Sequence, residues 1–144
     1  MSKSFYSLGL MSGTSMDGID VSIIKSDGDI KFEGILNKYF QYTEDFHRNL
    51  VNIRDKINSS QDLKIHSKEL KVLDKEITLL HSKAVNEVTK EIDFKIDFVG
   101  FHGQTIFHNA DEKISKQLGD GNLLSQLVKK KVVYDFRQND LRNG

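Results

Sequence analysis

A glycine-rich stretch near the N-terminus carries the side chains best suited to bind a charged ligand. Gly9–Asp20, with the sequence GLMSGTSMDGID, combines three glycines with hydroxyl and carboxylate side chains and contains no basic residue. Glycine lets a ligand approach the backbone closely, and phosphate is the commonest ligand that such backbone N–H groups bind. We therefore expect Gly13 and Gly18 to allow backbone angles or close approaches that a Cβ would block. A valine at Gly18 is expected to abolish phosphate contacts in the completed enzyme and to leave the fold largely intact.

The same stretch lacks the lysine of the best-known phosphate-binding loops. The Walker A motif requires a lysine after its second glycine, whereas Ile19 follows Gly18. The dinucleotide-binding fingerprint requires a helix after its glycines, whereas residues typical of a strand follow here. What remains is a hairpin whose backbone amides, together with the hydroxyls of Ser12, Thr14 and Ser15, can surround a phosphate. Asp17 and Asp20 would be near enough to hold a hydrated Mg²⁺ indirectly.

Three further polar clusters fall at the carboxyl ends of predicted strands, where ligands gather in sheets of this kind. They are His102-Gly103-Gln104-Thr105, Gly119-Asp120-Gly121, and Asp135 with Arg137 and Asp140. Each has an ordinary alternative: a structural histidine, a turn with a helix N-cap, and a surface ion pair, which contributes little to stability. The glycine-rich hairpin could equally be a plain turn. The coincidence of all four clusters at strand ends favours a binding site.

Hydrophobic periodicity predicts the elements that must position these clusters. The predicted strands are Phe5–Leu10, Ile19–Lys25, Ile30–Tyr42, Ile96–Phe101, Thr105–His108, Lys113–Leu118 and Lys131–Phe136. Helices are predicted after the N-caps Thr43 and Asp120 and, beyond a break at Asn58-Ser59-Ser60, along the apolar positions from Leu70 to Val88. This order predicts an α/β fold: a mixed sheet of three antiparallel strands followed by αβαβ, with helices on the sheet faces.

The composition limits the classes of function. The 144 residues suit one domain, and 38% hydrophobic with 29% charged residues is typical of a globular protein. Basic and acidic residues both number 21, so there is no basic surface for nucleic acid, and the run Lys129–Lys131 is too short to supply one. The chain has no cysteine, which excludes disulfides and thiolate–metal sites. The apolar run near the N-terminus is short and interrupted by glycines, which argues against a signal peptide or membrane association and for a cytoplasmic location.

Four motifs resemble, in order and spacing, those of the anhydro-N-acetylmuramic acid kinases of bacterial peptidoglycan recycling. The motifs are GLMSGTSMDGID, GFHGQTIFH, QLGDGNLL and VVYDFRQNDL, and the resemblance runs from Gly9 to Asn143. That family belongs to the superfamily of hexokinase and actin. The resemblance therefore implies a ribonuclease-H-like N-terminal lobe that binds ATP and Mg²⁺.

The resemblance also implies roles for individual residues. The ATP phosphates would be bound by the backbone amides of the loop Gly13–Asp20. This loop consists of Gly13, Thr14, Ser15, Met16, Asp17, Gly18, Ile19 and Asp20. The superfamily's usual D-x-G is here Met11-Ser12-Gly13, so the metal carboxylate must come from elsewhere. Asp140 would be the general base that activates water, with Asp135 as the alternative and Arg137 beside it. His102, Gln104, Thr105 and Asp120 would contact 1,6-anhydro-N-acetylmuramic acid.

Members of that family are well over twice as long as this chain, so the resemblance implies that residues 1–144 form a single N-terminal kinase lobe. Without the second lobe we expect no kinase activity from this chain alone. Completion by a second chain is one expectation, and a non-catalytic remnant or sugar-binding module is the alternative. Another sugar or a carboxylate as acceptor is a further alternative. Apolar surface at the lobe interface would favour a homodimer or poor solubility.

Overall fold

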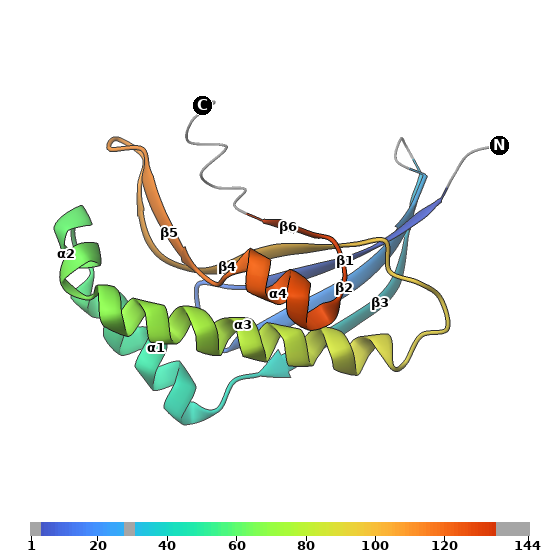
Figure 1. Ribbon diagram of the computed structural model, residues 1–144, viewed down its shortest axis with the longest axis horizontal. Helices are drawn as coiled ribbons and strands as arrows, with labels where there is room; N and C mark the ends of the chain where they lie inside the picture. The colour runs from blue at the N-terminus through green and yellow to red at the C-terminus, as the bar shows by residue number, and fades with distance from the viewer. Residues whose placement is uncertain (1–3, 28–30, 135–144) are drawn as a thin grey trace.

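A six-stranded mixed sheet organises the chain. The computed structural model describes residues 4–27 and 31–134 (Figure 1). Strands β1 (Phe5–Ser12), β2 (Gly18–Ser26) and β3 (Phe32–Gln41) form an antiparallel meander. Strand β4 (Phe98–Asn109) pairs in parallel with β1, and β5 (Ile114–Leu118) pairs antiparallel with β4. Strand β6 (Val132–Tyr134) pairs in parallel with the first half of β4, so the order is β3-β2-β1-β4-β5 with β6 beside β4. The predicted α/β class with a mixed sheet is confirmed.

Two of the helices begin at the caps that the sequence predicts. Helix α1 (Glu44–Lys56) follows Thr43, whose side-chain oxygen accepts a hydrogen bond from the Phe46 amide at 3.2 Å. The break at residues 58–60 is the start of a short helix α2 (Ser60–Ile65). The long helix α3 (Ser67–Thr89) follows directly, and α4 (Gly121–Val128) is capped by Asp120. None of the helices within residues 4–27 and 31–134 is long and apolar enough to cross a membrane.

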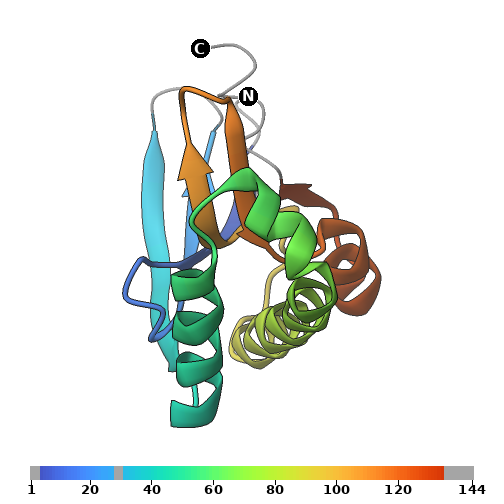
Figure 2. The ribbon, with the colours of Figure 1, turned by 90° about the vertical axis from the view of Figure 1, so that its left-hand side faces the viewer.

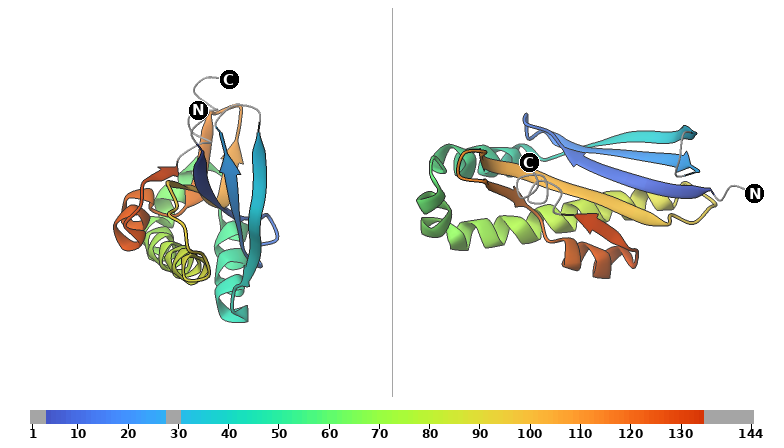
Figure 3. Two further views of the ribbon diagram at one scale, coloured as in Figure 1. Left: turned by 90° about the vertical axis from the view of Figure 1, so that its right-hand side faces the viewer. Right: turned by 90° about the horizontal axis from the view of Figure 1, so that it is seen from above.

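The described helices all cover the same face of the sheet (Figures 2 and 3). Alternation along the strands explains this arrangement, because successive side chains point to opposite faces. Leu8, Leu10, Val21 and Ile23 are buried on the helix side, whereas the residues between them, Gly9 and Ser22 among them, are exposed. Helices were predicted on the faces of the sheet, and within the described residues they cover one of its two faces.

One strand boundary was predicted wrongly. Ile96–Phe101 and Thr105–His108 are not two strands, because β4 runs without a break from Phe98 to Asn109. Two residues of β4, His102 and Gly103, lie opposite one residue of β1, since Leu10 pairs with Phe101 and Ser12 with Gln104. Gly103 has a φ of 77°, which a glycine adopts without strain, so the strand forms a bulge and continues. The HGQT cluster thus lies within a strand rather than after one.

Candidate functional site

Three of the four predicted clusters meet at one end of the sheet. Ser12 of β1 pairs with Gln104 of β4, and Gln104 pairs with Leu118 of β5, so the three residues form a row across the strands. The glycine-rich loop follows Ser12, and the Gly119–Gly121 turn follows Leu118. The fourth cluster, Asp135 with Arg137 and Asp140, lies outside the described residues.

The glycine-rich loop is held by its carbonyl groups. The Gly13 carbonyl accepts hydrogen bonds from the Met16 amide at 3.1 Å and from the Gln104 side-chain nitrogen at 3.0 Å. The Met16 carbonyl lies 2.8 Å from Nδ1 of His47 on α1. Because a carbonyl can only accept, Nδ1 of His47 must carry the proton. These bonds turn the carbonyl oxygens of Gly13 and Met16 toward the protein.

The amides of the loop remain available for a ligand. The Asp17 carbonyl accepts from the Tyr42 amide at 2.7 Å, so this peptide is also held from the protein side. In a trans peptide the C=O and N–H groups point in opposite directions, so the Thr14 N–H points away from the bonds that hold the Gly13 carbonyl. Among the described residues, no acceptor takes a hydrogen bond from the amides of Thr14, Ser15 or Asp17. All three of these residues are exposed, which gives the loop the donors that bind an anion.

The two loop glycines have different roles from those predicted. Met16, at φ 59°, is the residue of the loop in the left-handed region, and its side chain is buried in the core. A Cβ on Gly18 would overlap the Phe40 carbonyl oxygen and lie 2.7 Å from the Tyr39 ring, so the expectation that valine at Gly18 leaves the fold intact is wrong. A Cβ on Gly13 would meet no atom within 4 Å. Gly18 is thus required by strand packing, whereas Gly13 is open on its solvent side.

A buried polar network lies beneath the loop. The Ser12 hydroxyl donates to the Gln104 side-chain oxygen and lies 3.0 Å from the Tyr42 hydroxyl. Burial raises the pKa of the Tyr42 phenol, and the hydrogen bond between Tyr42 and Ser12 opposes that shift only in part. Gln104 is 1% exposed and uses both ends of its amide within the protein. In this structure Gln104 therefore supports the loop from within.

Of the other predicted sugar contacts, His102 lines a cavity of about 260 Å³ at the bulge of β4, whereas Thr105 and Asp120 are not part of its lining. His102, Gly119 and Tyr134 line this cavity, and Nδ1 of His102 lies 3.2 Å from the Gly103 carbonyl. Thr105 accepts a hydrogen bond from the Gln117 side chain at 3.3 Å. Asp120 is exposed and caps α4 by accepting from the Leu123 amide at 3.1 Å, which agrees with its predicted N-cap role.

The two aspartates of the predicted metal site point to different neighbours. Asp17 lies 3.6 Å from Nδ1 of His47, whereas Asp20 lines a shallow groove on the open face of the sheet together with His102. Desolvation and the charges of both aspartates raise the pKa of Tyr39. Residues 4–27 and 31–134 contain no group of three histidine or acidic side chains that could hold a metal ion.

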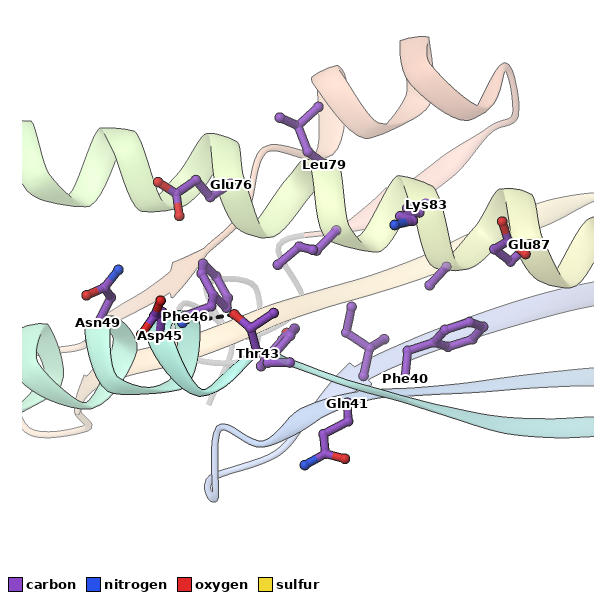
Figure 4. Close-up of a pocket in the computed structure, with 14 residues that line it drawn as sticks. Phe40, Gln41, Thr43, Asp45, Phe46, Asn49, Glu76, Leu79, Lys83 and Glu87 are labelled. Carbon is purple, nitrogen blue, oxygen red and sulfur yellow. Dashed lines mark hydrogen bonds between the residues drawn. The ribbon is translucent and has the colours of Figure 1, made fainter.

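A larger, mostly apolar hollow lies away from these clusters. Its volume is about 590 Å³, and it is bounded by α1, α3 and the end of β3 (Figure 4). Phe46 and Leu80 contribute to its apolar lining, and Asp45, Glu76 and Glu87 supply carboxylates. Among the predicted site residues that the structure describes, Ile19 alone lines it, with a side chain that belongs to the core.

The sequence did not show that Ser12, Tyr42 and His47 support the loop. Ser12 was predicted as one of the hydroxyls around the phosphate, whereas its side chain is buried and donates to Gln104. Ser12 was recoverable, because the alternation of β1 places it on the same face as Leu8 and Leu10. No sequence pattern identified Tyr42 and His47 as supports of the loop, because each lies 25 or more residues along the chain from the loop residue that it contacts.

Comparison with known proteins agrees with the motifs. A family model described as "Anhydro-N-acetylmuramic acid kinase" matches residues 5–144. A relative of that name from Pelagibacter ubique is 59% identical over 144 residues, which cover 100% of this chain and 38% of the relative. Relatives of the same name from Brucella canis and Rhizobium johnstonii are 37% and 38% identical over 140 residues, covering 95% of this chain and 38% of each relative.

The chain thus spans 38% of the length of the curated relatives that it matches, at their N-terminal end. The family match nevertheless covers nearly all of the chain, including the residues of all four clusters. This chain belongs to the anhydro-N-acetylmuramic acid kinase family.

Proposed function

We propose that this chain is the phosphate- and sugar-binding lobe of an ATP-dependent kinase that acts on 1,6-anhydro-N-acetylmuramic acid. The set of unpaired, exposed amides at Thr14, Ser15 and Asp17, in a chain of this family, carries the proposal. In the proposed reaction, ATP phosphorylates O6 of the sugar while water attacks C1 and the C1–O6 bond breaks. The products are N-acetylmuramate 6-phosphate and ADP, in cytoplasmic peptidoglycan recycling.

The loop suits phosphate because three of its carbonyl oxygens are bound by the protein. The carbonyls of Gly13, Met16 and Asp17 are all engaged by the protein, so they do not repel phosphate oxygens. The exposed hydroxyls of Thr14 and Ser15 add further donors. Asp17 and Asp20 are proposed only as indirect, water-mediated ligands of an Mg²⁺ ion that would accompany the nucleotide.

The proposed sugar contacts are His102, Thr105 and Asp120, with Gln104 contributing by supporting the loop. His102 lines the same cavity as Tyr134, the residue that directly precedes Asp135 in the sequence. We propose Asp140 as the general base that takes a proton from the attacking water, a role that typically contributes 10²–10⁴-fold to the rate. Asp135 remains the alternative base, and Arg137 would orient this segment.

A valine at Gly13 tests the phosphate loop, because its Cβ would meet no atom within 4 Å and the fold should be unchanged. The assay uses a chimera in which this chain replaces the matching 144 residues of the Pelagibacter ubique relative. Gly13→Val should raise the ATP KM about tenfold, because the side chain projects where the phosphates would approach.

Gly34→Val is the matched control, since Gly34 is also exposed, has open space around its Cβ position and lies on β3. It should leave both KM and the thermal midpoint unchanged. An ATP KM that is equal in the two variants would contradict the proposal that this loop binds the ATP phosphates.

A further inference from the structure

The turn that carries Asp120 is held by two side chains of one helix. The carboxylate of Asp74 on α3 accepts a hydrogen bond from the Gly119 amide at 2.9 Å. The hydroxyl of Thr78, one helical turn later, accepts from the Asp120 amide at 2.9 Å. Two successive backbone amides of the turn are thus bound by residues four apart on α3, which project from the same face of the helix.

These two side chains also engage further partners. The Thr78 hydroxyl donates to the Asp74 carbonyl at 2.6 Å, so it donates in one direction and accepts in the other. The second carboxylate oxygen of Asp74 lies 3.4 Å from Nζ of Lys116, which lines the cavity of about 260 Å³. Thr78 is fully buried, and the Asp74 side chain is 21% exposed, so water competes only weakly for these hydrogen bonds.

The turn needs this support because its conformation is unusual. Gly119 has a φ of 133°, and a Cβ there would overlap the ring of Phe101. A Cβ on Gly121 would likewise overlap the ring of Tyr134. The turn is thus confined on one side by aromatic rings and on the other by the acceptors of α3, and Gly119 and Gly121 both line the cavity.

We infer that Asp74 and Thr78 are positioning residues for the sugar site, an inference that rests on the proposed function. By fixing the Gly119 and Asp120 amides, they set the position of the Asp120 carboxylate and the wall of the cavity beside His102. They act through the turn and have no contact of their own with the substrate. Their loss should therefore weaken sugar binding without affecting the nucleotide loop, because no hydrogen bond among the described residues joins that loop to α3.

The first test measures amide hydrogen exchange by NMR in the 144-residue chain. Thr78→Val keeps the shape of the side chain and removes the hydroxyl that accepts from the Asp120 amide. Asp74→Leu keeps a similar shape and removes the carboxylate that accepts from the Gly119 amide. Exchange of the Asp120 amide in Thr78→Val, and of the Gly119 amide in Asp74→Leu, should be about 10- to 100-fold faster, because a buried hydrogen bond is lost.

The conservative variants and a control separate positioning from general stability. Thr78→Ser and Asp74→Asn retain an acceptor oxygen and should restore most of the protection. Thr89→Val loses only a bond within α3, from its hydroxyl to the Asn86 carbonyl, and should not change exchange in the turn. Unchanged exchange at Gly119 and Asp120, or an equal rise throughout the sheet, would overturn the inference. If Asp74→Leu does not fold, the comparison of Thr78→Val with Thr78→Ser decides whether α3 positions the turn.

The second test measures steady-state kinetics in the chimera. Thr78→Val should raise the sugar KM about tenfold and leave the ATP KM unchanged, whereas a merely structural role would move both. Equal changes in the two constants would refute positioning of the sugar site. If the unsubstituted chimera shows no sugar-dependent turnover, the proposed function fails, and the exchange experiment still decides whether α3 positions the turn.

Discussion

The buried His81 should make the stability of this protein depend steeply on pH. Its side chain on α3 is fully buried against Phe101, with ring centroids 4.9 Å apart. Nδ1 lies 2.7 Å from the Ile77 carbonyl, and Nε2 has no hydrogen-bond partner among the described residues. Burial lowers the pKa of His81 from 6.5 to about 4, although the bond to Ile77 opposes this shift. The folded protein thus holds His81 neutral where the unfolded chain would bind a proton.

The size of the effect follows from these two pKa values. Because the unfolded state binds the proton more tightly, acidification stabilises it, and the free energy of unfolding falls as pH drops through the unfolded-state value of 6.5. The loss should be about 2 kcal/mol at pH 5 and approach roughly 3 kcal/mol below pH 4. A loss of that size is a large fraction of the stability of a typical domain.

Urea unfolding of the parent chain and of His81→Leu between about pH 7 and pH 5 measures this contribution. Carboxylates titrate in both proteins, so the difference between the two pH profiles isolates His81. The parent should lose about 2 kcal/mol more than the variant over this range. Parallel pH profiles would refute the reasoning, since they would mean that His81 gains no proton on unfolding.

Two other predictions concern the glycine-rich loop and the proposed base. Gly18→Ala should lower the free energy of unfolding by about 1–3 kcal/mol, because its Cβ would overlap the Phe40 carbonyl, whereas Gly13→Ala should leave it nearly unchanged; urea midpoints check both. In the chimera, Asp140→Asn should lower kcat by about 10²–10⁴ with a smaller change in KM, measured by coupled ADP release. If Asp135→Asn alone abolishes turnover and Asp140→Asn stays active, the two roles are reversed.

Local patterns predicted most of the fold because local interactions determine most of it. Thr43 and Asp120 were recognisable as N-caps because the residue types that cap helices are few, and both side chains make the expected bond. The apolar spacing of Phe46, Leu50 and Ile53 likewise predicts the buried face of α1. The continuity of β4 was not predictable in this way, because Gly103 is a common strand terminator and only pairing with β1 and β5 shows that it forms a bulge.

The candidate site was predicted as clusters but not as a connected structure. The loop and the HGQT segment lie about 90 residues apart in the chain, and the bond from Gln104 to the Gly13 carbonyl depends on the parallel pairing of β1 with β4. The supports from His47, Asp74 and Thr78 come from helices whose polar positions look like ordinary helix surface in the sequence. Tertiary register, which no local pattern encodes, makes these residues part of the site.

Sugar-dependent ADP release tests the proposed function most directly. The assay compares the purified 144-residue chain with the chimera carrying the remainder of the Pelagibacter ubique relative, each with ATP, Mg²⁺ and 1,6-anhydro-N-acetylmuramic acid. Phosphoryl transfer depends on positioning and charge stabilisation in a closed site, which one lobe does not enclose. The chimera should release ADP only when the anhydro sugar is present, and the 144-residue chain should release none. Turnover by the 144-residue chain alone, or a folded chimera without sugar-dependent turnover, would contradict the proposal.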